Sequence, residues 1–369
     1  MMFSVRFFLL LGLLTVSEIC RGIAQIESAF KDTPSPLLES IGKEVENIFQ
    51  KAHPAVVKVK AVHPEATLCG TGFYINGEGH LITALAIIGD SNEIRVIDSV
   101  GTHRAKLIGK DQRTGVAYLK IEKSAQSLPT PYLKLATDSP LRASTPVIAI
   151  GYPLDLPPAP IFGFITGFDV FYNNRIFATT HIRSDISLTP GQLGCPLLNT
   201  RGEAIGIMVM SAGQGKFSFA LPAQAINKAI QDIDQYGKVL HGWVGVGVHE
   251  NPDKTTNDRS AVVSILFPDT PAEKSGIKVG DVLLQLNGKE IYKPSDVLDV
   301  SYFSEVGKTI QVTVLRDGQP HTFEYTVTER PAPRLAQSIQ NIAENSPTTS
   351  RGRFIPKILP TSSASEHNH

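Results

Sequence analysis

The residues with the most specific chemistry lie between Ser184 and Asn199. This segment contains Pro190-Gly191-Gln192-Leu193-Gly194-Cys195-Pro196 and leads into an apolar stretch from Glu203 to Val209. Glycines let a backbone turn sharply. A loop of this kind can direct two amide N–H groups at one carbonyl oxygen and stabilise the charge that develops there during acyl transfer. Acyl transfer also needs a nucleophile, and Leu193, at the centre of the loop, has a hydrocarbon side chain that cannot form an acyl intermediate.

The loop resembles the nucleophile loop of trypsin-like serine proteases, which reads Asp-x-x-x-x-Pro-Gly-Asn-Ser-Gly-Gly-Pro-Leu. Asp185, Pro190, Gly191 and Gly194 stand at their places in that pattern, and Leu193 stands at the serine. The resemblance implies an all-β fold of two barrels, with this loop in the second barrel.

Length and charge limit the classes of protein to consider. The chain has 369 residues, of which 42% are hydrophobic, and this is enough to form two or three compact units. Its 35 basic and 35 acidic residues balance, without a long basic run. Nucleic-acid binding requires a concentrated positive face, so we expect no nucleic-acid partner. No His, Cys, Asp or Glu residues recur at the spacing of metal ligands, so we expect no metal and no cofactor.

Residues 1–24 have the pattern of a secretory signal peptide. Arg6 precedes an apolar run from Phe7 to Val16, and Gly22-Ile23-Ala24 provides a small-x-small cleavage site. The apolar run is short for a bilayer span, and an uncleaved anchor is the alternative interpretation. We therefore expect export to the periplasm or cell envelope, with no stable membrane span after cleavage.

Short strand patterns separated by turn residues occupy most of the chain after residue 52. Such evenly spaced strands with glycine turns are typical of antiparallel barrels. Strand signals occur at 53–62, 71–75, 80–84, 93–97, 105–109, 116–121, 147–150, 161–171, 176–182, 196–198, 203–210 and 217–220, and a helix signal occurs at 222–236. The predicted order is a signal peptide at 1–24, a segment with a short helix at 25–52, a trypsin-like double barrel at 53–236 (about 53–127 and 128–236), a PDZ domain at 242–330 and a largely disordered tail at 331–369.

The region at 242–330 resembles a PDZ domain of the bacterial type. The run from Pro271 to Ile277 predicts a short helix, Gly280-Asp281 a turn, Val282 to Leu286 a buried strand, and Asn287-Gly288 a hairpin turn. The predicted fold class is therefore an all-β trypsin-like double β-barrel followed by an α+β PDZ domain.

A trypsin-like unit followed by one PDZ domain behind a signal peptide resembles the HtrA/Deg family of exported serine proteases. The resemblance covers roughly residues 53–330. The stretches that carry it are Cys69 to Ile75, Asp111 to Thr114, Ala117 to Ile121, Val147 to Pro153 and Phe217 to Pro222.

The family's triad positions are occupied by other residues in this chain. Ala86 aligns with the histidine, Gly115 with the aspartate and Leu193 with the serine. The sequence therefore predicts no catalytic residues and a catalytically dead member, a pseudoprotease that is not an enzyme. The alternatives are an active peptidase with displaced catalytic residues and a purely structural envelope component. For the active alternative, His80, His181 and Cys195 are the candidates, since a nucleophile and a base must come within hydrogen-bond reach.

The resemblance also implies peptide binding by the PDZ domain. Trp243, Val244, Gly245 and Val246 match the loop whose backbone N–H groups hold the terminal carboxylate of a peptide, beside a strand edge that adds the peptide as an extra strand. We expect a binding protein for peptides or protein C-termini, in envelope protein quality control. It is expected to form a homo-oligomer or to assemble with active relatives.

Cleavage after residue 24 would leave Cys69 and Cys195 as the remaining cysteines. In the trypsin fold their segments approach each other across the cleft between the barrels. The hypothesis is a Cys69–Cys195 disulfide, which an oxidising compartment permits. The alternative is two unrelated buried thiols that pack as small hydrophobic residues.

Overall fold

The computed structural model describes residues 35–122, 129–138, 140–173, 175–251 and 259–331. The predicted signal peptide and nearly all of the predicted tail lie outside these residues. The chain divides into two compact units, residues 1–47 and 48–369, and each is described by itself.

Helix α2, Pro36–Ala52, is the element that runs from the first unit into the second. Its apolar residues recur at helical spacing, as the sequence indicates. Glu39 lies in its first turn and forms a 2.7 Å ion pair with Lys43 one turn later, while Lys51 lies in its last turn. Charges so placed suit the helix dipole. A 3₁₀ turn, His53–Ala55, connects α2 to the first strand.

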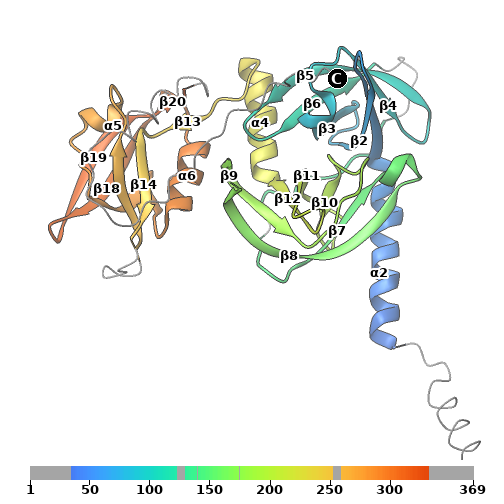
Figure 1. The fold of residues 1–369 in the computed structure, drawn as a ribbon, viewed down its shortest axis with the longest axis horizontal. Coiled ribbons are helices and arrows are strands. Elements are labelled where there is room, and N and C mark those ends of the chain that lie inside the picture. Colours follow the sequence, from blue (N-terminus) through green and yellow to red (C-terminus); the bar gives the residue numbers. More distant parts are fainter. Residues whose placement is uncertain (1–34, 123–128, 139, 174, 252–258, 332–369) are drawn as a thin grey trace, which may run out of the picture. The chain divides into compact units, whose positions relative to one another are not determined.

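The first six strands form a closed antiparallel barrel in the order β1-β2-β3-β6-β5-β4 (Figure 1). Buried and half-buried residues alternate along the second half of β1, as expected for a strand with one face inside a barrel. The strands are β1 Val56–Val62, β2 Thr67–Tyr74, β3 His80–Ala84, β4 Glu93–Ile97, β5 Thr102–Asp111 and β6 Val116–Ile121. A short helix that the sequence did not predict, α3 (Leu85–Ile88), follows β3.

The next six strands form a second closed barrel, in the order β10-β11-β12-β9-β8-β7 (Figure 1). They are β7 Pro146–Gly151, β8 Ala159–Tyr172, β9 Arg175–Ser184, β10 Pro196–Leu198, β11 Ala204–Ala212 and β12 Phe217–Pro222, with a 3₁₀ turn at Pro153–Asp155. Helix α4, Ala223–Tyr236, follows and ends at Gly237, whose φ of 72° suits a glycine cap. Two closed barrels confirm the predicted double-barrel fold.

The remaining strands and two helices form the PDZ domain. Its main sheet has the order β14-β15-β16-β18-β19, and β17 pairs with β16. The predicted hairpin turn is present, with positive φ at Asn287 (51°) and Gly288 (74°). The elements are β13 Gly242–Trp243, β14 Val246–Glu250, β15 Ala261–Leu266, α5 Pro271–Lys274, β16 Val282–Leu286, β17 Lys289–Glu290, α6 Pro294–Phe303, β18 Thr309–Arg316, β19 Gln319–Thr326 and β20 Thr328–Glu329.

Two polar contacts join helix α6 and the start of the PDZ domain to the barrels of the same compact unit. The Asp299 carboxylate on α6 accepts hydrogen bonds from Thr179 Oγ1 (2.6 Å) and from the N–H (2.7 Å) and Oγ1 (2.6 Å) of Thr180 on β9. The buried His241 ring lies 2.9 Å from Asp111 Oδ1. Burial alone would raise the pKa of Asp111, but the hydrogen bond and charge of His241 outweigh it and lower that pKa.

Candidate functional site

The loop between β9 and β10 depends on two glycines. Gly191 has a φ of 93° and Gly194 a φ of 86°, a backbone region that favours glycine. Neither position has room for a side chain. A Cβ on Gly191 would lie 2.3 Å from the carbonyl oxygen of Tyr152, and a Cβ on Gly194 would lie 2.2 Å from that of Thr71. The sequence-based prediction of a sharply turned loop is therefore confirmed.

Thr71 on β2 holds this loop from the first barrel. Its backbone N–H donates to the carbonyl oxygen of Leu193 (2.9 Å), and its hydroxyl donates to the carbonyl oxygen of Gly191 (2.7 Å). The same hydroxyl oxygen accepts the N–H of Tyr152 (3.1 Å). Thr71 was not among the functional residues expected from the sequence, although it lies at the centre of the matched Gly70-Thr71-Gly72 motif.

Ala86 and Gly115 lie in adjoining segments. The carbonyl oxygen of Gly115 accepts the N–H of Leu85 at 2.8 Å, one residue before Ala86 on α3. Gly115 has a φ of 76°, and a Cβ there would lie 3.8 Å from Val209 Cβ. Position 115 therefore has space for a side chain, but its positive φ disfavours any residue other than glycine.

Leu193 is half-buried and packs against the apolar cores of both barrels. The next residue, Gly194, is so close to the end of β3 that a Cβ on it would lie 2.8 Å from the backbone N of Ala84. These contacts place the loop beside the segment that carries Ala86. The aligned positions 86, 115 and 193 are thus in one region, but their side chains offer neither a nucleophile nor a base.

The three candidates for a displaced site have separate surroundings. His80 Nδ1 lies 3.0 Å from Asn76, and His181 Nδ1 lies 2.8 Å from the carbonyl oxygen of Thr179. Burial lowers the pKa of His181 to about 4 and raises the pKa of the Cys195 thiol to about 12. In the described part of the chain, no hydrogen bond joins any two of His80, His181 and Cys195.

The predicted Cys69–Cys195 disulfide is not formed in the structure, where both cysteines are free thiols. Cys195 is fully buried in the apolar core of the second barrel. Cys69 is half-exposed on β2, paired with Lys60 of β1. Cys195 thus packs as a small hydrophobic residue, as the alternative of two unrelated thiols predicts for it.

The PDZ residues Trp243 to Val246 form the connection from β13 to β14. Val244 is buried, and Gly245 has a φ of 72° with Thr270 behind it, where a Cβ would come within 2.7 Å. Among the residues that the structure describes, no hydrogen-bond acceptor faces the backbone N–H of Val244 or of Gly245. Two adjacent free amides of this kind are suited to bind a carboxylate.

Strand β14 lies at the end of the PDZ sheet, so one of its edges is unpaired. Helix α6 contacts the same strand. An extended peptide can add to such an edge through main-chain hydrogen bonds. The free amides at Val244 and Gly245 lie directly before this edge.

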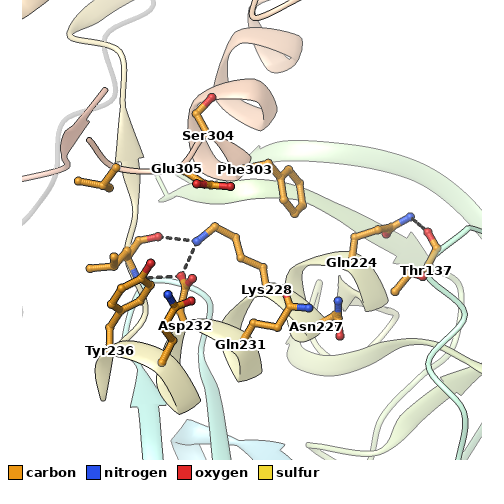
Figure 2. Close-up of a pocket in the computed structure, with 13 residues that line it drawn as sticks. Thr137, Gln224, Asn227, Lys228, Gln231, Asp232, Tyr236, Phe303, Ser304 and Glu305 are labelled. Atoms are coloured by element: carbon orange, nitrogen blue, oxygen red, sulfur yellow. Dashed lines mark hydrogen bonds and ion pairs between the residues drawn. The ribbon is translucent and has the colours of Figure 1, made fainter. Parts of the chain in front are cut away.

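A cavity lies elsewhere, between α4 and the end of α6 (Figure 2). It has a volume of about 540 Å³. Within the described ranges, no group of three or more His, Cys, Asp or Glu residues could hold a metal ion. This cavity could not be predicted from the sequence, because it forms only where two elements distant in sequence meet.

Two family models match the chain. A trypsin-like peptidase domain matches residues 70–207, and a PDZ domain matches residues 242–327. A probable periplasmic serine endoprotease DegP-like of Ectopseudomonas mendocina is 32% identical over 311 residues, which cover 79% of this chain and 63% of that protein. The protein with the same description in Pseudomonas fluorescens is 32% identical over 304 residues, with the same coverage of each.

The chain thus combines a trypsin-like peptidase domain with a PDZ domain and is similar to HtrA/DegP-like proteins. It spans about 63% of the length of these relatives. Their periplasmic descriptions agree with the predicted location in the periplasm or cell envelope. Among the helices that the structure describes, none is long and apolar enough to cross a membrane.

Two solved structures share the fold of this chain. An HtrA-type protease AlgW with a tripeptide has a TM-score of 0.68 and 26% identity, and the match covers 79% of this chain and 98% of AlgW. The serine endoprotease from Yersinia pestis has a TM-score of 0.58 and 26% identity, and the match covers 81% of this chain and all of that one.

These relatives correct one prediction. Ala86, Gly115 and Leu193 at the aligned triad positions led to the prediction that the chain is not an enzyme. The relatives are named serine endoproteases, and the structural neighbours are proteases. These names contradict the prediction that the chain is not an enzyme. The loss of the three aligned side chains does not exclude hydrolysis by other groups.

Proposed function

We propose that the PDZ domain of this HtrA/DegP-like chain binds the carboxyl-terminal end of a peptide or protein in the periplasm or cell envelope. The observation that carries the proposal is the pair of free backbone amides at Val244 and Gly245, placed directly before the unpaired edge of β14. The amides would hold the terminal carboxylate, and β14 would add the preceding residues as a further strand. The tripeptide in the AlgW structure supports the proposal.

The peptide ligand would be apolar at its end. Val246 and Val248 on β14 are half-buried and pack against the PDZ core. Apolar side chains along this strand favour apolar residues in a peptide that adds to its edge. C-termini of that kind become accessible in unfolded envelope proteins, so a role in protein quality control is part of this proposal.

The test is a titration of the full mature chain with a library of free C-terminal peptides, read by fluorescence anisotropy. The informative variant is Gly245→Ala, whose Cβ would collide with Thr270 and displace the amides. The matched control is Gly280→Ala in the same domain, with a φ of 97° and no atom within 4 Å of its Cβ. We expect at least tenfold weaker binding for Gly245→Ala than for the control. Peptides with amidated ends should bind weakly to every form. Equal binding of free and amidated ends would overturn the proposal.

A second candidate function is peptide-bond hydrolysis with displaced catalytic residues. It is favoured by the serine endoprotease relatives. The aligned position 193 is a leucine, so the nucleophile would be another side chain near the loop. Purified mature protein would be treated with a fluorophosphonate probe and with casein, beside a mock purification from cells without the gene. Labelling or cleavage that follows the protein through two columns would support hydrolysis. Absence of both at stoichiometric concentration would reject this candidate.

Assembly is the remaining part of the proposal, either as a homo-oligomer or with active relatives. Sedimentation velocity of the mature chain, alone and mixed with an active relative, measures it directly. A monomer under both conditions would contradict it.

A further inference from the structure

The cavity between α4 and α6 has one wall made of a single helix face. Residues 224, 227, 228, 231, 232 and 235 of α4 line it, a spacing of three or four that places them on one side of the helix. Phe303, Ser304 and Glu305 at the end of α6 lie across from them (Figure 2). Its volume of about 540 Å³ is in the range of small-molecule sites.

Three primary amides in this wall are open to a ligand: Asn227 is half-buried, and Gln231 and Gln235 are exposed. In the described part of the chain, the side chains of Asn227, Gln231 and Gln235 form no hydrogen bond, whereas Gln224 donates to the carbonyl oxygen of Thr137. A primary amide presents two donors and one acceptor oxygen. The cavity therefore offers several donors and acceptors to a polar ligand at once.

The charges in the cavity are already paired. The Lys228 ammonium contacts the Asp232 carboxylate and donates to the carbonyl oxygen of Leu240 at 2.6 Å (Figure 2). It also lies 5.3 Å from the centre of the Tyr302 ring. Asp232 also accepts the N–H of Leu240 (2.9 Å). Glu305 lies 3.7 Å from Lys308. An anion would meet no free cation here, so the lining favours an uncharged ligand.

Two aromatic side chains complete the lining. Tyr236 is 53% exposed, and Phe303 is half-buried. Aromatic rings beside planar amides can stack on the C–H faces of a sugar while the amides bond its hydroxyl groups. The polar wall would leave unpaired groups beside a purely apolar ligand.

We propose that this cavity binds an uncharged, N-acetylated saccharide. An acetamido group has one N–H donor and one carbonyl acceptor, so it can pair with a primary amide in both directions. Ring hydroxyls would use the other amides, and the C–H faces would stack on Tyr236 or Phe303. The site is separate from the peptide groove at Val244 and Gly245 and does not depend on the function proposed above.

The test uses N,N′,N″-triacetylchitotriose (chitotriose below) as the probe and the full mature chain, with isothermal titration calorimetry and saturation-transfer NMR. We expect saturable binding at up to millimolar concentration, with sugar protons that receive saturation from the protein. A saturating PDZ peptide should leave the affinity unchanged within twofold. Binding of inorganic phosphate at the same site, or no saturation transfer to chitotriose, would overturn the proposal.

Matched variants locate the binding. Gln231→Ala and Tyr236→Ala should each weaken chitotriose binding at least fivefold. Gln112→Ala, an exposed glutamine elsewhere, and Tyr132→Ala, a tyrosine that is 58% exposed, are the controls and should stay within twofold. All four side chains are on the surface, so the folded state is retained and can be checked by the melting temperature. Equal losses in variants and controls would reject the cavity as the binding site.

Discussion

At the scale of single residues, the loop after β9 depends on the absence of side chains. Gly194 combines a φ of 86° with a backbone carbonyl oxygen 2.2 Å from the place of its missing Cβ. The positive φ and the close contact each oppose a side chain at this position. At other glycines of the chain, only the positive φ does so.

Replacement of Gly194 by alanine should therefore cost more than the conformational strain alone. We expect Gly194→Ala to lower the free energy of unfolding by roughly 3 kcal/mol or more, because backbone atoms of β2 and β3 have to move. The control Gly318→Ala has a φ of 76° but no atom within 4 Å, and should cost about 1–2 kcal/mol. Urea denaturation measures both. Similar losses would mean that the loop is not held as tightly as these contacts indicate.

The two thiols should differ in reactivity. Cys69 is half-exposed, whereas Cys195 is fully buried with a pKa raised to about 12 by burial. Since the thiolate is the reactive form, Ellman's reagent should label one thiol of the native mature chain quickly and the second only after unfolding. Cys69→Ser should remove the fast reaction. Failure to titrate any thiol in denaturant without reductant would restore the disulfide hypothesis.

At the scale of elements, strand β9 contains a histidine that the fold keeps neutral. His181 is 1% exposed and stacks on Phe177 with 4.2 Å between the ring centres. Burial is the main cause of its low pKa of about 4, against an ordinary 6.5. The unfolded chain thus binds a proton that the folded chain does not bind between these two values.

Stability should therefore fall as the pH falls from about 6.5 towards 4. The contribution of His181 is on the order of 3 kcal/mol across that window. His181→Phe should remove this part of the pH dependence, whereas His249→Asn, at an exposed position on β14, should retain it. Thermal melts at pH 4.5 and 7.5 compare the two variants. An unchanged pH slope in His181→Phe would contradict the assignment.

Some of these structural features could be predicted from the sequence alone, and others could not. The hairpin at Asn287-Gly288 is local and was predicted from the sequence. Asn and Gly both tolerate the positive φ that such a turn requires. Helix α3 was missed, since four apolar residues after a strand fit a strand continuation equally well. The burial of Cys195 and the position of the α4 side-chain amides in a cavity both depend on tertiary contacts. No local sequence pattern could therefore predict them.

The prediction about catalysis failed for a related reason. In the family, the reactive side chains lie at three aligned positions. In this chain those positions are Ala86, Gly115 and Leu193, which have no reactive side chain. They do not describe every group that a fold can bring to a cleft. The hydrogen bonds of Thr71 to two residues of the loop, 120 positions away for Gly191, illustrate what alignment cannot show.

At the scale of the whole molecule, the contacts of Asp299 tie α6 to β9. One carboxylate accepts three hydrogen bonds from Thr179 and Thr180. Removal of the carboxylate leaves those donors without their partner, which costs roughly 1–3 kcal/mol.

Asp299→Ala should therefore weaken the coupling between the PDZ domain and the barrels. We expect a single calorimetric unfolding transition in the parent chain and two resolved transitions, or a broader one, in the variant. Glu250→Ala, an exposed carboxylate on β14, serves as the control and should keep the parent profile. A sharp single transition in Asp299→Ala would show that other contacts dominate the coupling.

Leu193 also sets an order of events during folding. Its side chain packs against the cores of both barrels, and its carbonyl oxygen is held by Thr71 of the first. Neither surface exists until its own barrel has closed, so the loop can reach its final geometry only after both have formed. Leu193→Ala should then speed unfolding and leave the folding rate nearly unchanged, with a φ-value near zero. The nascent chain consequently passes through a stage in which both barrels are built and the site between them is not yet shaped.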